Sequence, residues 1–229
     1  MTFWNRLLDL LFPPKCPFCG RVLDHPGICA SCQKALVWTG EKHEIHILEN
    51  SIPCAAPLWY TGIVRKGHLR FKFHGGFDAA EILADLMEPC VAARLGGEFQ
   101  MVTWVPVSRK RLRSRGYDQA ELLAQALCRR WRKKPVRLLD KIRDNPAQSG
   151  LPGDQRRGNV RGAYRVRNRA AVKGKRILLI DDICTTGSTL SECAQTLLNA
   201  GARSVVCAAM AHTGMERKTD GEYKPSEPY

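Results

Sequence analysis

One stretch of the sequence decides the fold: Lys175-Arg176-Ile177-Leu178-Leu179-Ile180-Asp181-Asp182-Ile183-Cys184-Thr185-Thr186-Gly187-Ser188-Thr189. The uninterrupted apolar run from Ile177 to Ile180 is typical of a central parallel strand, because such a strand is buried on both faces. Two carboxylates follow the run, and ligands of open α/β sheets bind at the carboxyl ends of the strands. The stretch therefore predicts a strand, a ligand-binding loop and a helix, in that order.

The residues after the acidic pair have the composition of a phosphate site. Hydroxyl donors are concentrated there, and the amides that open the following helix have no partner inside that helix. These residues are Thr185, Thr186, Gly187, Ser188 and Thr189. The aspartates repel phosphate, but they can accept hydrogen bonds from the 2′ and 3′ hydroxyls of a ribose. A sugar 5-phosphate satisfies both ends, whereas a capped turn without a ligand does not need so many donors.

Strand-like and helical runs alternate along the rest of the chain, which favours an α/β sheet with parallel strands. The runs are Pro57 to Thr61, Ala79 to Leu95, Met101 to Val105, Ala120 to Trp131, Val136 to Leu139, Ile177 to Ile180, Leu190 to Asn199 and Ser204 to Met210. We expect a zinc-binding module and linker at residues 1–50, the sheet domain at 51–213 and a disordered tail at 214–229.

Four cysteines near the start predict the zinc site. They form two C-x2-C pairs, Cys16-Pro17-Phe18-Cys19 and Cys29-Ala30-Ser31-Cys32. Two such pairs complete a tetrahedral structural site with no open position, so the metal holds the fold and catalyses nothing. Disulfides or unlinked thiols are the alternative. His43, His46 and Cys54 are a second candidate ligand set, but their spacing is poor and a solvated linker is favoured.

Composition and charge limit the compartment and the partners. The 229 residues are 44% hydrophobic with a formal net charge of +14, so the surface should attract nucleotides, nucleic acid or anionic lipid. Ten cysteines without a cleavable signal sequence favour the reducing cytoplasm. The apolar start from Phe3 to Phe12 contains Arg6 and Asp9 and is too short to span a bilayer, so we expect no stable membrane insertion.

A second segment, from Arg109 to Arg115, carries five basic residues and no acidic one. A strand-like run leads into Pro106 just before it, so we expect a basic loop that follows a strand. A solvated charge run is the alternative interpretation.

The stretch around Asp181 resembles the phosphoribosyl pyrophosphate motif of type I phosphoribosyltransferases, because the apolar strand, Asp-Asp and Thr-Thr-Gly-Ser-Thr occur together in order. The resemblance implies a parallel sheet with helices on both faces. It also implies that Asp181 and Asp182 contact the ribose in a catalytic role, that Thr185 through Thr189 hold the 5′-phosphate, and that Mg²⁺ accompanies the ligand. The pyrophosphate donors that it implies are Ser108, Arg109, Lys110 and Arg115.

A wider set of features is similar to the ComF/GntX family, whose members are linked to DNA uptake in natural competence. The features are the cysteine quartet, Arg115-Gly116-Tyr117-Asp118-Gln119, the segment from Gln148 through Asn159, and the Asp-Asp-Thr-Thr-Gly motif. Tyr117 and Asp118 stand where Phe and Asn are expected. The resemblance covers roughly Phe12 to Met210. It implies a protein that binds phosphoribosyl pyrophosphate and acts in DNA uptake, with single-stranded DNA and competence-machinery proteins as candidate partners.

The sequence leaves the chemistry open, because no segment identifies an acceptor for a transferase reaction or a hood for a nucleobase. A nucleobase-salvage enzyme is therefore a weaker alternative. A single-stranded nucleic-acid-binding protein without transferase activity is another. Three basic clusters favour it, with aromatic residues between them for base stacking. They are Arg109 to Arg115, Arg129 to Arg137 and Arg156 to Arg169, with Tyr117, Trp131 and Tyr164 interleaved. Buried aromatics and solvated arginines are the plain explanation of the same residues.

Overall fold

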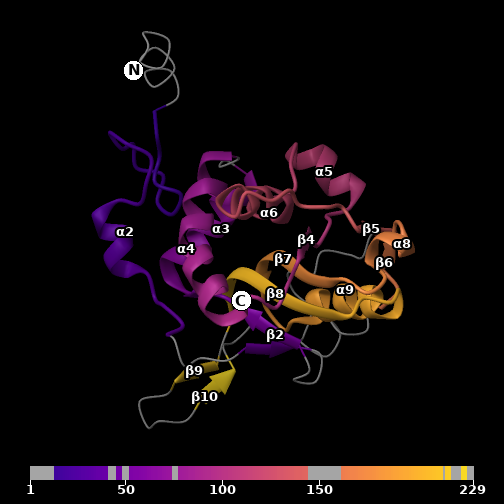
Figure 1. Ribbon diagram of the computed structural model, residues 1–229. Coiled ribbons are helices and arrows are strands. Elements are labelled where there is room, and N and C mark those ends of the chain that lie inside the picture. Colours follow the sequence, from indigo (N-terminus) through magenta and orange to yellow (C-terminus); the bar gives the residue numbers. More distant parts are fainter. Residues whose placement is uncertain are drawn as a thin grey trace.

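A six-stranded sheet organises the chain, with the strand order β1-β2-β8-β7-β4 and with β3 also paired to β8 (Figure 1). Its strands are β1 (Ile45–Ile47), β2 (Ile52–Ala55), β3 (Leu58–Trp59), β4 (Met101–Trp104), β7 (Arg176–Cys184) and β8 (Ser204–His212). The computed structural model describes residues 13–40, 45–47, 52–73, 77–143, 161–213, 215–217 and 223–225. The predicted family segment from Gln148 through Asn159 lies outside them, as does His43.

The sheet is mixed, whereas the sequence predicted parallel strands throughout. Strands β2, β3, β4, β7 and β8 pair in parallel, but β1 runs antiparallel to β2 at the edge. The reason is the short connection between these two strands, since a parallel pair requires a crossover of a dozen or more residues. The ligand-bearing centre is still parallel, because β7 lies between β4 and β8.

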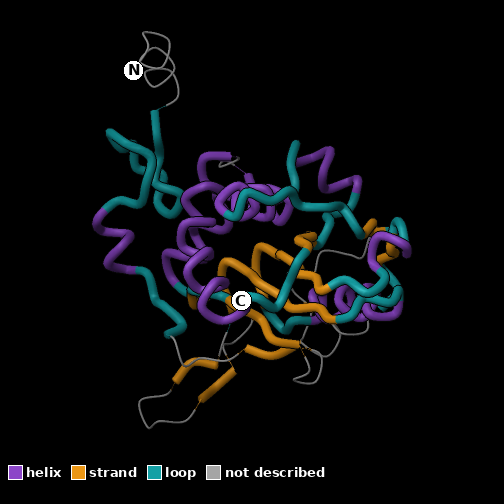
Figure 2. The backbone as a smooth tube through the Cα atoms, in the orientation of Figure 1, coloured by secondary structure: helices purple, strands orange, loops and turns teal. Residues whose placement is uncertain are grey.

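Helices cover both faces of the sheet, as the resemblance implied (Figures 1 and 2). On one face, α3 (Gly62–Phe73), α4 (Phe77–Leu95) and α6 (Gln119–Arg130) share a core with Leu178 and Ile180 of β7. On the other face, α9 (Ser188–Asn199) packs on Ile177 and Leu179. Alternate residues of β7 thus pack into the cores on opposite faces of the sheet, because successive side chains of a strand point to opposite faces.

Smaller elements complete the description. They are α2 (Ala30–Ala35), α5 (Arg109–Arg115), α8 (Arg169–Val172), β5 (Leu139–Lys141), β6 (Tyr164–Val166), β9 (Met215–Arg217) and β10 (Tyr223–Pro225). Strands β5 and β6 form one antiparallel pair, and β9 and β10 form another. Disorder was expected from residue 214 onward, and this pair departs from it for the six residues concerned. No helix in the described ranges combines the length and apolarity that a bilayer crossing requires.

Candidate functional site

The strand, loop and helix predicted around the acidic pair are present. Strand β7 continues to Cys184, four residues past the expected apolar run, because β8 extends alongside it and pairs Ile183 with Ala211. Asp181 and Asp182 therefore lie within strand β7, near its carboxyl end, and not after it. Helix α9 begins at Ser188, which leaves Thr185, Thr186 and Gly187 as the connecting loop.

The connecting loop has the conformation of an anion cradle. Gly187 precedes α9 in the left-handed region, with φ of 72°, and it has no side chain to cap the helix, while the Thr186 hydroxyl oxygen accepts the Ser188 amide at 3.4 Å. Thr185 and Thr186 are exposed, and the hydroxyl oxygens of Thr186 and Ser188 lie 2.7 Å apart. A small pocket opens beside them, lined in part by Asp181, Thr185, Gly187 and Thr189. Free helix amides, hydroxyls and a glycine thus converge at one point, which suits a phosphate.

The pKa values of the two aspartates are shifted in opposite directions. Burial raises the pKa of Asp181 well above its ordinary range, and the charge of Asp182 adds to this effect. Burial also opposes ionisation of Asp182, but His68 outweighs it by charge and hydrogen bonding, so the pKa of Asp182 is lowered. The pKa values of these adjacent carboxyl groups are thus shifted in opposite directions, as expected where two like charges would otherwise be buried together.

Helix α3, which was not predicted from the sequence, supplies the partner of Asp182. His68 Nε2 lies 2.8 Å from Asp182 Oδ2, and His68 Nδ1 lies 2.9 Å from the Tyr60 hydroxyl. Lys72, one turn further along, has its pKa lowered by burial, while the charge of Asp182 opposes that shift. The buried residues Val64, Gly67, His68 and Phe71 are spaced as on one face of a helix. This spacing in the sequence could have predicted the helix, but not which carboxylate the histidine contacts.

The predicted basic loop is in fact helix α5. The Arg-Gly-Tyr-Asp-Gln motif that follows it ends α5, begins α6 and hydrogen-bonds to α3. Gly116 ends α5 with φ of 80°, and Asp118 begins α6 by accepting the Ala120 amide while it also binds the Val107 amide. The Tyr117 hydroxyl donates to the Phe71 carbonyl, a bond that phenylalanine could not make. The motif therefore connects α5 and α6 to α3 and to the segment that follows β4, and these elements form one frame around the site.

The candidate pyrophosphate donors lie at different places on this frame. Ser108 is buried and begins α5, where its hydroxyl oxygen accepts the Arg111 amide. Arg109 and Lys110 are exposed at the start of the helix, and within the described ranges neither forms an ion pair. Arg115 bonds Gln119 and lies close enough to Lys72 for its charge to lower the Lys72 pKa. Of these four candidate donors, Arg115 is the one whose charge acts on Lys72.

Four residues of the other basic clusters form ion pairs within the described ranges, namely Arg129, Arg130, Arg137 and Arg167. Arg130 pairs with both Glu81 and Asp85, and Arg129 also pairs with Glu81. The aromatic residues proposed for base stacking are engaged in packing. Tyr164 is 6% exposed, Tyr117 is bonded to α3, and the Trp131 indole N–H donates to Glu88. Packing therefore leaves Tyr164 little surface for a base and occupies part of Tyr117 and of Trp131, which are half-buried.

The four cysteines come together as predicted. Their sulfur atoms all lie within 4.8 Å of one another, and the Sγ atoms of Cys19 and Cys29 are 3.7 Å apart. A tetrahedral zinc with Zn–S bonds of about 2.3 Å requires S–S edges of about 3.8 Å, so the quartet fits this metal. In the described ranges it is the single cluster of this kind, and His46 and Cys54 form no second set.

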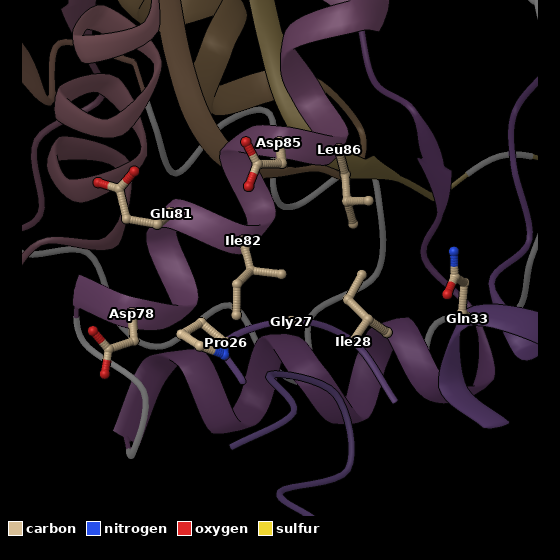
Figure 3. Close-up of a pocket in the computed structure, with 9 residues that line it drawn as sticks. All are labelled: Pro26, Gly27, Ile28, Gln33, Asp78, Glu81, Ile82, Asp85 and Leu86. Atoms are coloured by element: carbon tan, nitrogen blue, oxygen red, sulfur yellow. The ribbon is translucent and has the colours of Figure 1, made fainter. Parts of the chain in front are cut away.

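A groove of about 420 Å³ lies between the zinc module and α4 (Figure 3). Ile28 faces Ile82 and Leu86 across it. Its α4 wall also carries three carboxylates, from Asp78, Glu81 and Asp85. The residues that line this groove include no hydroxyl or cationic group, whereas Thr185 and Thr189 line the smaller pocket at the β7–α9 loop, so that pocket fits a phosphorylated ligand better.

Strand, acidic pair, cradle loop and helix together define a site of the phosphoribosyltransferase type. Comparison with known proteins agrees: the phosphoribosyl transferase domain family matches residues 112–227, and the double zinc ribbon domain matches residues 7–43. The chain therefore belongs to the phosphoribosyl transferase domain family and, with its zinc ribbon and its relatives, to the ComF/GntX family within it.

Three relatives illustrate the family. The DNA utilization protein YhgH of Escherichia coli O157:H7 is 34% identical over 83% of this chain and 80% of its own. The competence protein ComFC of Bacillus subtilis is 27% identical over 81% of this chain and 72% of its own. Competence protein F of Haemophilus influenzae is 32% identical over 59% of this chain and 62% of its own.

Proposed function

We propose that the chain binds phosphoribosyl pyrophosphate at the β7–α9 loop and acts in the cytoplasm in the handling of incoming DNA. The observation that carries the binding proposal is the position of the α9 start, with its hydroxyl groups, beside the two adjacent carboxyl groups of β7. A 5′-phosphate needs the first feature and a ribose diol needs the second. One sugar phosphate can engage both, because the two features are separated only by the end of β7 and the loop.

The pyrophosphate end of such a ligand would extend toward α5. Lys72, Arg111 and Arg115 lie there within electrostatic range of one another. Cations placed around a leaving group stabilise the charge that develops as its bond to C1′ breaks. Arg109, Lys110 and the Ser108 hydroxyl are the further donors that we propose, and they would have to meet the ligand at the exposed start of α5.

The site offers Mg²⁺ one ionised carboxylate, that of Asp182. The ion binds proteins through one or two carboxylates and completes its shell with water and substrate phosphates. Asp182 is the carboxyl group held ionised, so it is the group whose charge would attract the ion. Asp181, whose pKa is raised by burial, would hydrogen-bond the sugar together with Asp182. When bound, the metal would neutralise pyrophosphate charge.

The biological part of the proposal rests on the relatives. Proteins named for DNA utilization and for competence match more than four fifths of this chain. We infer a related role here, with competence-machinery proteins as partners.

Single-stranded DNA is a second candidate ligand, favoured by one surface. Helix α5 exposes Arg109, Lys110 and Arg113, and Phe73 is 60% exposed with the Arg115 guanidinium carbon 5.6 Å from its ring centre. Basic side chains beside an accessible ring suit a strand of nucleotides. Binding there should weaken steeply between low and moderate salt, and an affinity that does not change would exclude the DNA proposal.

A screen of pyrophosphate release tests the enzymatic part. The protein is incubated with phosphoribosyl pyrophosphate, magnesium and, in turn, nucleobases, nucleosides and single-stranded DNA. Release with one acceptor class, lost when Thr186 and Ser188 are replaced by valine and alanine, would support a transferase. Binding without release for any acceptor would leave a binding protein, and no binding at all would refute the proposal.

A further inference from the structure

The buried histidine of α3 uses both ring nitrogens. His68 is 3% exposed, and its two polar contacts are the Tyr60 hydroxyl and the Asp182 carboxylate, at 2.9 and 2.8 Å. The Tyr60 ring meets the imidazole edge-on, with ring centres 5.4 Å apart. The ring is therefore fixed in both position and orientation.

The hydrogen bonds around Asp182 leave a defined capacity for a ligand. Asp182 Oδ1 accepts the Ile183 amide at 2.8 Å, and Oδ2 meets His68. A carboxylate has about four acceptor positions, two on each oxygen, so about two remain. The side chain is 21% exposed, so a ligand can reach them. Two positions, one on each oxygen, match two hydroxyl groups on adjacent carbons of a ribose.

The direction of the hydrogen bond to Asp182 follows from the carboxylate. Because a carboxylate can only accept, His68 Nε2 carries a proton and donates to Asp182. Tyr60 holds the other ring nitrogen, Nδ1, at 2.9 Å. The contacts from Tyr60 through His68 thus end on the carboxylate that has to accept from the sugar.

The zinc module supports the helix that carries the histidine. Phe18, between the first two cysteine ligands, is fully buried against Gly67, where a β-carbon would lie 2.5 Å from the phenylalanine ring. Gly67 directly precedes His68. A module that packs so closely at this point leaves α3 little room to shift away from Asp182.

We propose that His68, oriented by Tyr60, is a positioning residue that holds the Asp182 carboxylate in place for the ribose hydroxyls of the ligand. It acts through Asp182 and does not touch the phosphate cradle. The inference rests on the proposed function and adds to it a residue that sets the preference for ribose over bare phosphate. Substitution of His68 should therefore weaken the sugar contact and spare the phosphate contact.

The test compares ribose 5-phosphate with inorganic phosphate by calorimetry on the full-length, zinc-loaded protein. The variants are His68→Leu, His68→Gln and Tyr60→Phe. Tyr117→Phe is the matched control, since it also removes one hydrogen bond to α3 but lies away from the acidic pair. For His68→Leu we expect affinity for ribose 5-phosphate to fall about tenfold to a hundredfold, the usual effect of losing a charged hydrogen bond, while affinity for phosphate stays within about twofold. His68→Gln, which can still donate to Asp182, should recover most of the loss.

The outcomes separate the two proposals. If the wild-type protein binds neither ligand, the proposed function fails and this inference fails with it. If the wild-type protein binds ribose 5-phosphate and the leucine and phenylalanine variants bind it equally well, the positioning role alone is refuted. An equal loss for both ligands would mean general damage to the fold and would also refute it. Should His68→Leu not fold, the glutamine and Tyr60→Phe variants decide by the same comparison.

Discussion

Replacement of Gly187 by alanine should damage the phosphate loop by two separable mechanisms. The residue has φ of 72°, and an alanine in that region costs roughly 1 to 2 kcal/mol. In addition, the new β-carbon would lie 2.7 Å from Ile47 Cγ2 and 3.2 Å from Ile47 Cβ. Overpacking of this kind costs about 1 to 3 kcal/mol. We therefore expect the free energy of unfolding to fall by about 2 to 5 kcal/mol, a large part of the total for a typical domain.

Urea denaturation of four proteins separates these mechanisms: the wild type, Gly187→Ala, Ile47→Ala and the double variant. Ile47→Ala alone should cost about 2 to 4 kcal/mol. In the double variant the clash is relieved, so its loss should be smaller than the sum of the single losses by about 1 to 3 kcal/mol. Gly174→Ala is the control, because it has φ of 71° but nothing near the new β-carbon. Losses that add within about 0.5 kcal/mol would refute the contact between Ile47 and the loop.

Three further predictions address other parts of the molecule. Cys32→Ser should abolish the binding of one zinc per chain, measured by metal analysis, and lower the melting temperature, because the module folds around the metal; an unchanged metal content would contradict the quartet. Arg109→Ala with Lys110→Ala should weaken pyrophosphate binding in competition assays, whereas Lys134→Ala on a distant loop should not, and equal effects would mean that only net charge matters. Burial raises the pKa of Asp118 to about 6 from an ordinary value of 3.8, so its contribution to stability is full below the lower value and is lost as pH rises through the upper one. Asp118→Asn should therefore reduce the loss of stability between pH 4 and 6 in denaturation curves, and an identical pH profile would contradict this.

The parts that sequence predicted well are local. The apolar run before Asp181, the loop donors and the start of the next helix are neighbours in the chain, so composition and order define them together. The cysteine pairs were equally clear, because ligand spacing within each pair is a local property. Periodicity also placed α4, α6 and α9 to within a few residues.

The parts that sequence could not predict depend on distant partners. His68 meets Asp182 across 114 positions, and no local pattern encodes that contact. The basic segment was interpreted as a loop, but Ser108 and Gly116 give it the two ends of a helix. Tyr164 is buried and Trp131 is half-buried with its indole N–H bonded to Glu88, which composition could not show, because it does not tell which side of a ring is buried.

Titration calorimetry of the phosphoribosyl donor, in magnesium, most directly examines whether the end of β7 and the start of α9 form one sugar-phosphate site. We predict one molecule bound per chain, and at least a tenfold weaker association when Asp181 and Asp182 are both changed to asparagine. An absence of measurable heat with the wild-type protein, or an unaltered association in the doubly substituted protein, would contradict the account.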